Sequence, residues 1–161
     1  MYGYKLKINC IPEIVWACET TVTDYHWKNR HSEDMLEISV STYKEKTVIY
    51  NNTKFNLKKG NLSCIIGNEE VECYCEKGAA ISILSVAVKF KNINFSRGEI
   101  TENDLSDNSV LLLPAFYSEI NISNELEIVK ILHNIIKFSS DNSENEKAAF
   151  ISEFFKLLQK I

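Results

Sequence analysis

Several common functional signatures are missing from this chain of 161 residues. It has only five glycines and no glycine-rich loop, so nucleotide binding through a cradle of backbone amides is not expected. Its five cysteines include no C-x-x-C motif, and most lie within apolar strand patterns. An odd number of such thiols predicts reduced cysteines in a cytoplasmic protein. No apolar run approaches membrane-spanning length, and the N-terminus MYGYKLKIN lacks the apolar core of a signal peptide, so no membrane association is expected.

The chain also has no excess of basic over acidic residues. The net charge of −4 and the pI near 5.5 argue against direct binding of this chain to a phosphate backbone. The composition, 45% apolar and 25% charged residues, is typical of a globular protein. A chain of this length can form one domain with a substantial core.

Residues 26–66 predict three strands joined by two turns. In the first strand, Glu37 has the parity of His31 and Glu33, so an unbroken strand would place these three side chains on one face. Asn51-Asn52 predicts a tight hairpin, because asparagine tolerates a positive φ. Residues 58–61 (KKGN) predict the second turn, and residues 62–66 the third strand. This order describes half of a small β-barrel.

Further strands are predicted on both sides of this stretch, at residues 4–8, 14–18, 71–75 and 110–113. Residues 79–90 form the longest apolar run. They are too rich in β-branched residues on both faces to favour a helix, and we expect a central strand. Residues 91–109 predict a loop. The whole pattern predicts a β-barrel spanning roughly residues 4–113.

After residue 120 the apolar spacing becomes helical and predicts helices near 124–138 and 144–161, the second opened by a capping box. The outward apolar set of the barrel, such as Leu36, Ile38 and Val40, looks too small to cover both helical stripes. We therefore expect a homodimer with the helices at its centre. The expected interface residues are Leu126, Val129, Leu132, Ile136, Phe150, Phe154 and Leu157.

Three motifs in this order resemble the N-terminal effector-binding and dimerisation domain of AraC-type transcriptional regulators. Residues 30–33 (RHSE) stand where the family often has His-x-His, residues 58–62 (KKGNL) resemble its x-x-G-D-L turn, and residues 112–114 (LLP) resemble the end of its barrel. The resemblance implies a mainly β fold, a cupin-like barrel of the double-stranded β-helix type followed by two C-terminal α-helices.

The resemblance also implies a division of the chain and of its function. A cupin-like sensor barrel would occupy residues 1–120, with a helical dimerisation appendage over residues 121–161 in the same domain unit. The chain would sense a small-molecule effector and would not be an enzyme. The 161 residues include no basic recognition helix, so DNA would be bound only through a separate C-terminal domain that is not in this chain.

A cupin barrel encloses a pocket of the size of one small molecule. The residues expected to bind the effector are Trp16, Arg30, His31, Glu33, Glu37 and Tyr74. Together they offer a stacking face and directional hydrogen bonds suited to a sugar or another small polar metabolite. Trp16 and Tyr74 could each instead be core residues, since aromatic side chains are usually buried for packing alone.

A metal-dependent cupin enzyme, such as an isomerase or a dioxygenase, is the alternative function. Metal-binding cupins use His-x-His, a glutamate and a later histidine. Here Glu33 replaces the second histidine, and residues 71–73 (VEC) stand where the last one is expected. Because the ligand set is short of imidazoles, we expect no metal and no cofactor. A stand-alone interaction domain, with a barrel filled by side chains, is a third possibility.

Overall fold

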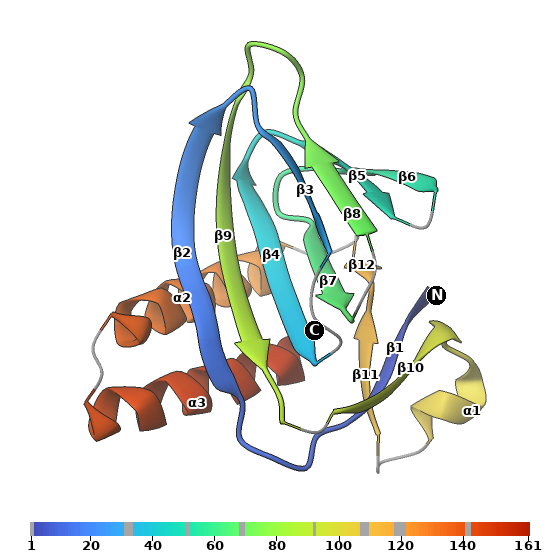
Figure 1. The fold of residues 1–161 in the computed structure, drawn as a ribbon, viewed down its shortest axis with the longest axis vertical. Helices are drawn as coiled ribbons and strands as arrows, with labels where there is room; N and C mark the ends of the chain where they lie inside the picture. Colours follow the sequence, from blue (N-terminus) through green and yellow to red (C-terminus); the bar gives the residue numbers. More distant parts are fainter. Residues whose placement is uncertain are drawn as a thin grey trace.

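The computed structural model of the chain describes residues 2–30, 34–50, 52–67, 70–91, 93–106, 110–117, 122–140 and 143–161. Its elements, in chain order, are β1 (Tyr2–Lys7), β2 (Glu13–Thr23), β3 (His26–Arg30), β4 (Met35–Tyr43), β5 (Lys46–Tyr50), β6 (Thr53–Leu57), β7 (Leu62–Ile66), β8 (Glu70–Tyr74), β9 (Ala80–Lys89), β10 (Asn94–Glu99), α1 (Glu102–Leu105), β11 (Leu111–Pro114), β12 (Phe116–Tyr117), α2 (Ile122–Ser139) and α3 (Glu144–Lys160) (Figure 1).

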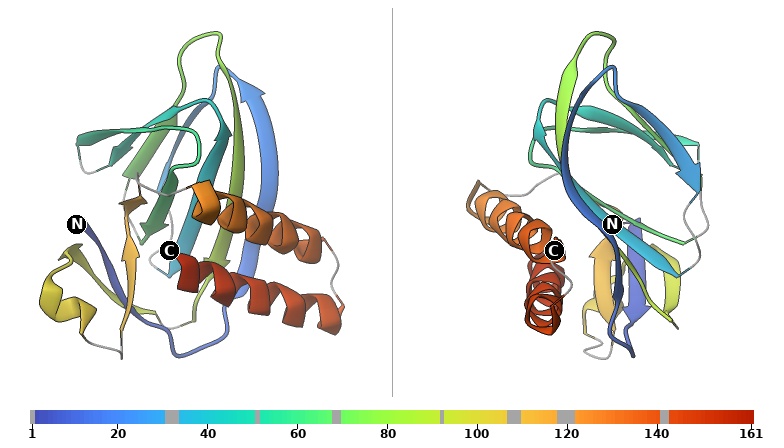
Figure 2. Two further views of the ribbon diagram at one scale, coloured as in Figure 1. Left: turned by 180° about the vertical axis from the view of Figure 1, so that it is seen from behind. Right: turned by 60° about the vertical axis from the view of Figure 1, so that its left-hand side comes forward.

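The strands form three antiparallel sheets. A five-stranded sheet of order β12-β7-β4-β9-β2 faces a four-stranded sheet of order β3-β8-β5-β6, and a three-stranded sheet of order β10-β1-β11 lies at one end of both (Figures 1 and 2). The predicted mainly β fold with two C-terminal helices is confirmed. In the described residues the sheets remain separate, so the arrangement is an open sandwich and not a closed barrel.

The outer face of the five-stranded sheet is a regular apolar surface. Leu36, Ile38 and Val40 of β4 pair with three residues of β7 on one side and three of β9 on the other. This outer grid consists of Leu36, Ile38, Val40, Leu62, Cys64, Ile66, Leu84, Val86 and Val88, and each member is at most 1% exposed. Every second side chain of a strand points to the same face, so three neighbouring strands in register produce the grid.

Helices α2 and α3 cover the outer grid (Figure 2). Leu132, Phe150, Phe154 and Leu157 are at most 1% exposed within the single chain. The expectation that the sheet is too small to receive both helical stripes is therefore wrong, because β7 and β9 triple the apolar set of β4. These four residues are not available to a partner. No helix in the described part of the chain is both long and apolar enough to span a bilayer.

The other predicted interface residues differ from these four. Leu126 is 67% exposed, whereas Val129 and Ile136 are half-buried against the edge of the same core. The homodimer stays a prediction, and only the outward side of α2 remains as a part of the expected interface.

Most predicted elements are present, with two corrections. Residues 80–89 form a strand as expected, and β5 and β6 form the predicted hairpin, with Asn52 at a φ of +59°. Residues 91–109 are not a simple loop, because they contain β10 and α1. The first strand of the 26–66 stretch is not continuous either: β3 ends at Arg30, and β4 begins at Met35 in the neighbouring sheet.

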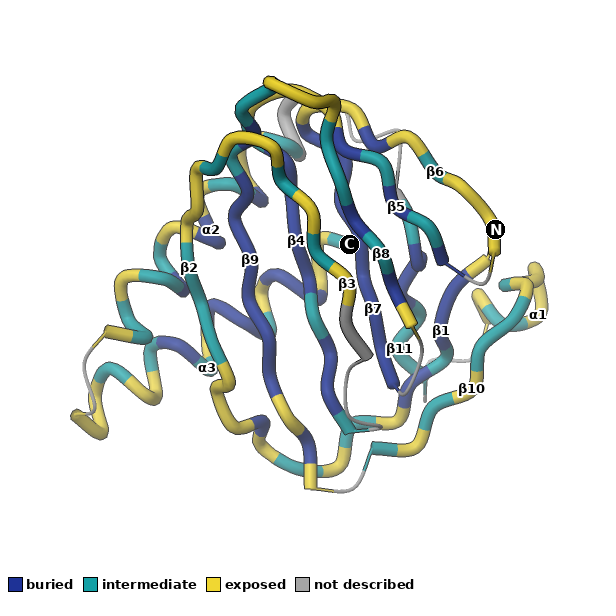
Figure 3. The backbone as a smooth tube through the Cα atoms, turned by 45° about the horizontal axis from the view of Figure 1, so that its top comes forward, coloured by how far each residue is buried: buried dark blue, intermediate teal, exposed yellow. Residues whose placement is uncertain are grey.

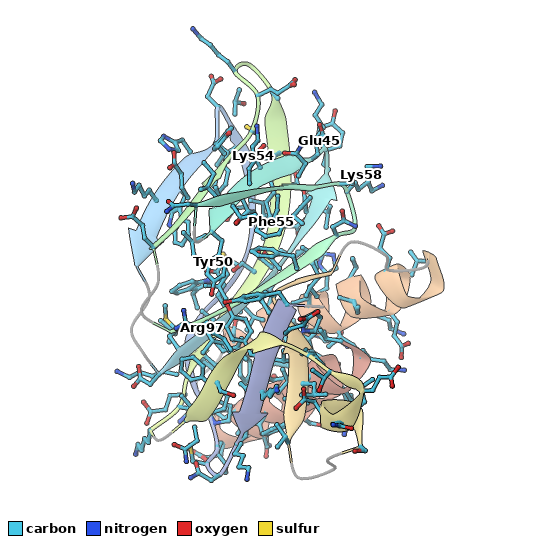
Figure 4. The ribbon with its side chains drawn as sticks, turned by 90° about the vertical axis from the view of Figure 1, so that its right-hand side faces the viewer. Glu45, Tyr50, Lys54, Phe55, Lys58 and Arg97 are labelled. Atoms are coloured by element: carbon cyan, nitrogen blue, oxygen red, sulfur yellow. The ribbon has the colours of Figure 1, made fainter. Side chains whose placement is uncertain are left out.

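An aromatic cluster connects the β5–β6 hairpin to the rest of the sandwich (Figure 4). The Tyr50 hydroxyl lies 2.9 Å from that of Tyr4 on β1, and Phe55 stacks on Phe116 of β12 with ring centroids 4.1 Å apart. Burial raises the pKa of both tyrosines above the ordinary value. The hairpin is therefore held against the core at its tip end by packing and by a buried hydrogen bond.

Candidate functional site

A cavity of about 210 Å³ lies between the five-stranded and the four-stranded sheet. It is on the opposite side of β4 and β9 from the helices. The residues that line it are Trp16, Cys18, Thr20, Tyr25, Trp27, Glu37, Ser39, Lys46, Ile65, Cys73, Ile83 and Ser85. Both tryptophans of the chain are among them. A concave site with apolar walls and a few converging polar groups is the usual form of a small-molecule site.

The wall formed by the five-stranded sheet carries a row of three serines. Ser85 of β9, Ser39 of β4 and Ser63 of β7 are direct neighbours across the strands. They are at most 7% exposed, and the Ser39 and Ser63 hydroxyls lie 2.8 Å apart. Ser39 and Ser85 face the cavity. The row is a polar strip on the three central strands, whose other face carries the outer grid.

Lys46 reaches this strip from the opposite sheet. It begins β5, where it shares an inward parity with Val48 and Tyr50, and it is 3% exposed. Its Nζ donates to Ser39 Oγ at 2.9 Å and, over a longer distance of 3.5 Å, to Ser63 Oγ. Among the described residues these hydroxyls are its side-chain partners, and no ion pair involves it. A buried cation with neutral partners is uncommon, because charge is costly to remove from water.

Trp16 and Glu37 meet at Ser85, at the other end of the strip. The Trp16 indole N–H donates to Ser85 Oγ at 3.1 Å, and the same hydroxyl donates to Glu37 Oε1 at 3.0 Å. Trp16 stands just after a register shift in β2, which adjusts the aim of its side chain. The Glu37 carboxylate is therefore oriented by a hydrogen bond while it lines the cavity.

The Tyr25 hydroxyl and the Cys73 thiol, which also line the cavity, are held in their neutral forms. Burial is the main cause that raises the pKa of Tyr25 well above its usual range, with the Cys73 thiol and Glu37 adding to the effect. Burial also raises the pKa of Cys73 to about 11, although the nearby Lys46 acts in the opposite direction. A thiol with so high a pKa is a poor nucleophile at neutral pH, so Cys73 does not suggest covalent catalysis.

The predicted effector-binding residues fall into three groups. Trp16 and Glu37 line the cavity. Tyr74 does not line it: β8 directs Cys73 inward and Tyr74 outward, where the centroid of its ring lies 6.4 Å from that of His26. Its part in effector binding stays a prediction. Of Arg30 the structure describes only the backbone, at the end of β3.

His31 and Glu33 lie outside the described residues. In the part of the chain that the structure describes, no three histidine, cysteine, aspartate or glutamate side chains form a group that could hold a metal ion. The expectation of no bound metal stays a prediction, because the two residues on which the metal alternative depends are not described.

Several cavity residues were not predicted from the sequence. The most informative is Lys46, and a signal for it exists: in the strand 46–50 (KTVIY) it has the parity of a valine and a tyrosine that face inward. Trp27 was not predicted because its neighbours in the stretch 26–30 (HWKNR) are all polar and no apolar alternation indicates its direction. Tyr25 lies in the connection that precedes β3, where no periodicity indicates a direction.

No protein-family model and no curated protein sequence matches this chain. Solved structures of ToxT from Vibrio cholerae align with it. One of apo ToxT covers 96% of this chain and 58% of that chain, at 11% identity and a TM-score of 0.48. One of ToxT with a bound unsaturated fatty acid covers 98% and 55%, at 14% identity and a TM-score of 0.45. The chain thus spans less than two thirds of these ToxT chains. TM-scores below 0.5 establish neither a family nor a ligand for it.

Proposed function

We propose that this chain is the effector-sensing domain of an AraC-type transcriptional regulator, which binds a small molecule and does not catalyse a reaction. The observation that carries the proposal is the cavity between the two sheets, with both tryptophans, Glu37 and Lys46 in its wall. The order of the RHSE, KKGNL and LLP motifs supports the family. Binding to DNA would require a separate helix-turn-helix domain.

The strands offer a direct path from the cavity to the helices. On β4, Glu37 and Ser39 line the cavity, while Leu36, Ile38 and Val40 belong to the outer grid under the helices. A ligand that displaces β4 or β9 by a fraction of an ångström would shift the grid as well, since a close-packed interior transmits displacement. A change at the cavity can in this way alter the position or the stability of α2 and α3, which is what a sensor requires.

The direct test is a binding screen that uses the two tryptophans as reporters. Because both line the cavity, a bound ligand should change the intrinsic fluorescence with no tryptophan background from elsewhere. A panel of sugars, small organic acids and neutral aromatic compounds would be titrated against the purified chain. Saturable binding by one chemical class is expected, and a panel in which no compound binds would contradict the proposal.

Glu37→Ala tests whether the cavity is the binding site. The variant should weaken binding of whichever compound the screen identifies by about tenfold, with little loss of fold, because Glu37 is only half-buried. Glu45→Ala is the matched control, since it removes the same charge from an exposed position between β4 and β5 (Figure 4). Equal affinities of the two variants would place the binding site elsewhere.

Dimerisation is the second part of the proposal, and the outward side of α2 is the surface that supports it. Leu126 is 67% exposed on this helix. If α2 forms the interface, Leu126→Glu should shift the protein towards monomer in sedimentation velocity at micromolar concentration. Leu105→Glu on α1 is the control, because Leu105 is equally exposed, at 69%. A wild-type protein that sediments as a monomer at high concentration would contradict this part.

A further inference from the structure

The cavity wall contains a buried amine that makes no ion pair within the part of the chain that the structure describes, although the Glu37 carboxylate lines the same cavity. Lys46 is 3% exposed, and among the described residues its Nζ donates to the Ser39 and Ser63 hydroxyls at 2.9 and 3.5 Å. An ammonium has three N–H donors. In the described residues two of these have hydroxyl acceptors, one of them at a long distance, and no carboxylate is paired with the amine. Within these residues at least one N–H of Lys46 is therefore left for a ligand in the cavity that the side chain lines.

A structural role explains this lysine poorly. Two serine hydroxyls that already bond to each other at 2.8 Å do not need a buried cation to satisfy them. A buried ammonium whose hydrogen-bond partners in the described residues are neutral hydroxyls opposes folding. A buried polar side chain that faces a cavity is typical of a binding site, where a ligand supplies a further hydrogen-bond partner.

The shape of the cavity limits the ligand. Its volume is about 210 Å³, whereas an apolar cavity of about 150 Å³ holds one benzene molecule in another protein. A compound the size of one substituted ring fills such a space, and a long alkyl chain does not. The lining also includes apolar and aromatic side chains that can pack on the body of a ligand, with Ile65, Ile83, Tyr25 and Trp27 among them.

We propose that the cavity binds a small organic carboxylate whose body is about the size of a single ring, with the carboxylate held by Lys46 and the adjacent serine hydroxyl and the body between the two sheets. This inference rests on the proposed sensing function and names the class of its effector. At the far end of the serine strip, Glu37 is placed to accept a hydrogen bond from a hydroxyl or amine substituent of the ligand.

The test compares benzoate with benzamide, which has the same ring and nearly the same shape but no charge. Both would be titrated into the wild-type chain by tryptophan fluorescence and by isothermal titration calorimetry. Benzoate should bind about tenfold or more tightly than benzamide, because hydrogen bonds to charged groups are the stronger ones. Equal binding of the two compounds, or tighter binding of benzamide, would overturn the inference.

Lys46→Met identifies the residue responsible. Methionine keeps a long unbranched side chain without the charge, so benzoate binding should be lost while benzamide binding is kept. Lys59→Met, which removes a charge from the exposed turn after β6, should leave both affinities unchanged. Benzoate that binds Lys46→Met as tightly as the wild type would overturn the inference. If Lys46→Met does not fold, the melting temperature of the wild type decides the question. Benzoate should raise it and benzamide should not, and an equal rise with both compounds would overturn the inference.

Two further compounds separate this inference from the proposed function. If glucose binds in the cavity and benzoate does not, the proposed sensing function still holds, but the inference that the effector is a carboxylate is overturned. Hexadecanoate that binds more tightly than benzoate would overturn the size limit. If neither the sugars, the acids nor the neutral aromatic compounds bind, the proposed function fails together with the inference.

Discussion

The two faces of β4 and β9 differ in chemistry, although alternate residues of the same two strands form them. The outward face contributes Leu36, Ile38, Leu84 and Val86 to the outer grid, which is completely buried under the helices. The inward face carries Glu37, Ser39 and Ser85, with Lys46 reaching across to it. Figure 3 shows the central strands of this sheet as largely buried along their length. Burial alone thus does not distinguish a face that stabilises from a face that binds.

The chemistry of each face indicates its role. Apolar side chains that pack on helices contribute to stability in proportion to the area they bury, and no polar group interrupts the outer grid. The inner face instead carries buried hydroxyls, a half-buried carboxylate and a buried amine, which gain little from burial and must be satisfied by hydrogen bonds. We infer that the outward face holds the fold together and that the inward face is retained for binding at some cost.

The largest effect is expected from a truncation on the helical side. Phe154 is fully buried. Its ring is parallel to that of Phe150, with centroids 6.2 Å apart, and its centroid lies 6.5 Å from that of Phe90, which directly follows β9. Phe154→Ala leaves a cavity there and should lower the free energy of unfolding by about 3–5 kcal/mol. Urea denaturation followed by circular dichroism measures this loss.

The matched control for Phe154→Ala is Leu126→Ala on the exposed side of α2. With 67% of its surface exposed, Leu126 should contribute less than about 0.5 kcal/mol. If both variants lose a similar free energy, the helices do not gain their stability from the outer grid, and the contrast between the two faces is wrong.

Adjacent residues of β9 allow the sharpest comparison. Val86 belongs to the outer grid, whereas Ser85 faces the cavity. Val86→Ser places a hydroxyl in an apolar layer and should cost roughly 2–3 kcal/mol. Ser85→Ala removes a hydroxyl that bonds to Trp16 and Glu37, and should cost about 1 kcal/mol or less while it weakens ligand binding.

Chemical denaturation and a fluorescence titration of the same two variants check this comparison. The two faces would not be functionally distinct if Ser85→Ala were the more destabilising variant, or if Val86→Ser impaired ligand binding as strongly as Ser85→Ala in folded protein.

The sequence is sufficient to predict the outward half of this contrast. Alternation identifies Leu36, Ile38 and Val40 as one face, and the helical stripes identify the side chains that cover it. The size of the receiving surface was underestimated, because strand neighbours are not visible in a single sequence. That β7 and β9 lie in register on either side of β4 is a consequence of topology, and it removes the need for a second copy to cover the stripes.

The inward half could be predicted only in part. Trp16 and Glu37 were found because an aromatic and an acidic side chain stand among strand residues. The outward direction of the Tyr74 side chain could not be predicted, because β8 is short and its parity has no reference point in the sequence. Lys46 was missed because a lysine at a strand end is usually exposed. Its burial depends on the opposite sheet, which brings Ser39 and Ser63 within reach.

A pH dependence of stability is expected from the inward face. The pKa of the Cys73 thiol rises from 9.0 to about 11, mainly because burial disfavours the thiolate. The folded state therefore keeps a proton that the unfolded chain loses, so this contribution to stability is complete below pH 9 and is lost as the pH rises towards 11. The loss for Cys73 alone should be roughly 1 kcal/mol by pH 10.

Comparison of Cys73→Ala with the wild type from pH 8 to pH 10 isolates this contribution. The variant should lose less stability over the range, while Cys10→Ala, outside the cavity, should follow the wild type. Other buried groups, such as the Cys64 thiol, have raised pKa values too, so the difference between the curves is the quantity to measure. Parallel curves for Cys73→Ala and the wild type would show that the thiol is not held neutral by its surroundings.

The smallest expected effect has the opposite sign. Lys46→Met removes a buried charge that has only hydroxyl partners in the described residues, and the Ser39–Ser63 hydrogen bond of 2.8 Å remains. Without ligand, the variant should be more stable than the wild type by about 0.5–1 kcal/mol, because an apolar side chain of similar length replaces an uncompensated cation. Residues of binding sites commonly cost stability in this way, whereas residues that support the fold do not. A Lys46→Met variant that loses more than about 1 kcal/mol would show that the amine is satisfied within the chain. Lys46 would then belong with the outer grid as a stabilising group, and the functional contrast between the two faces of the sheet would not hold at this position.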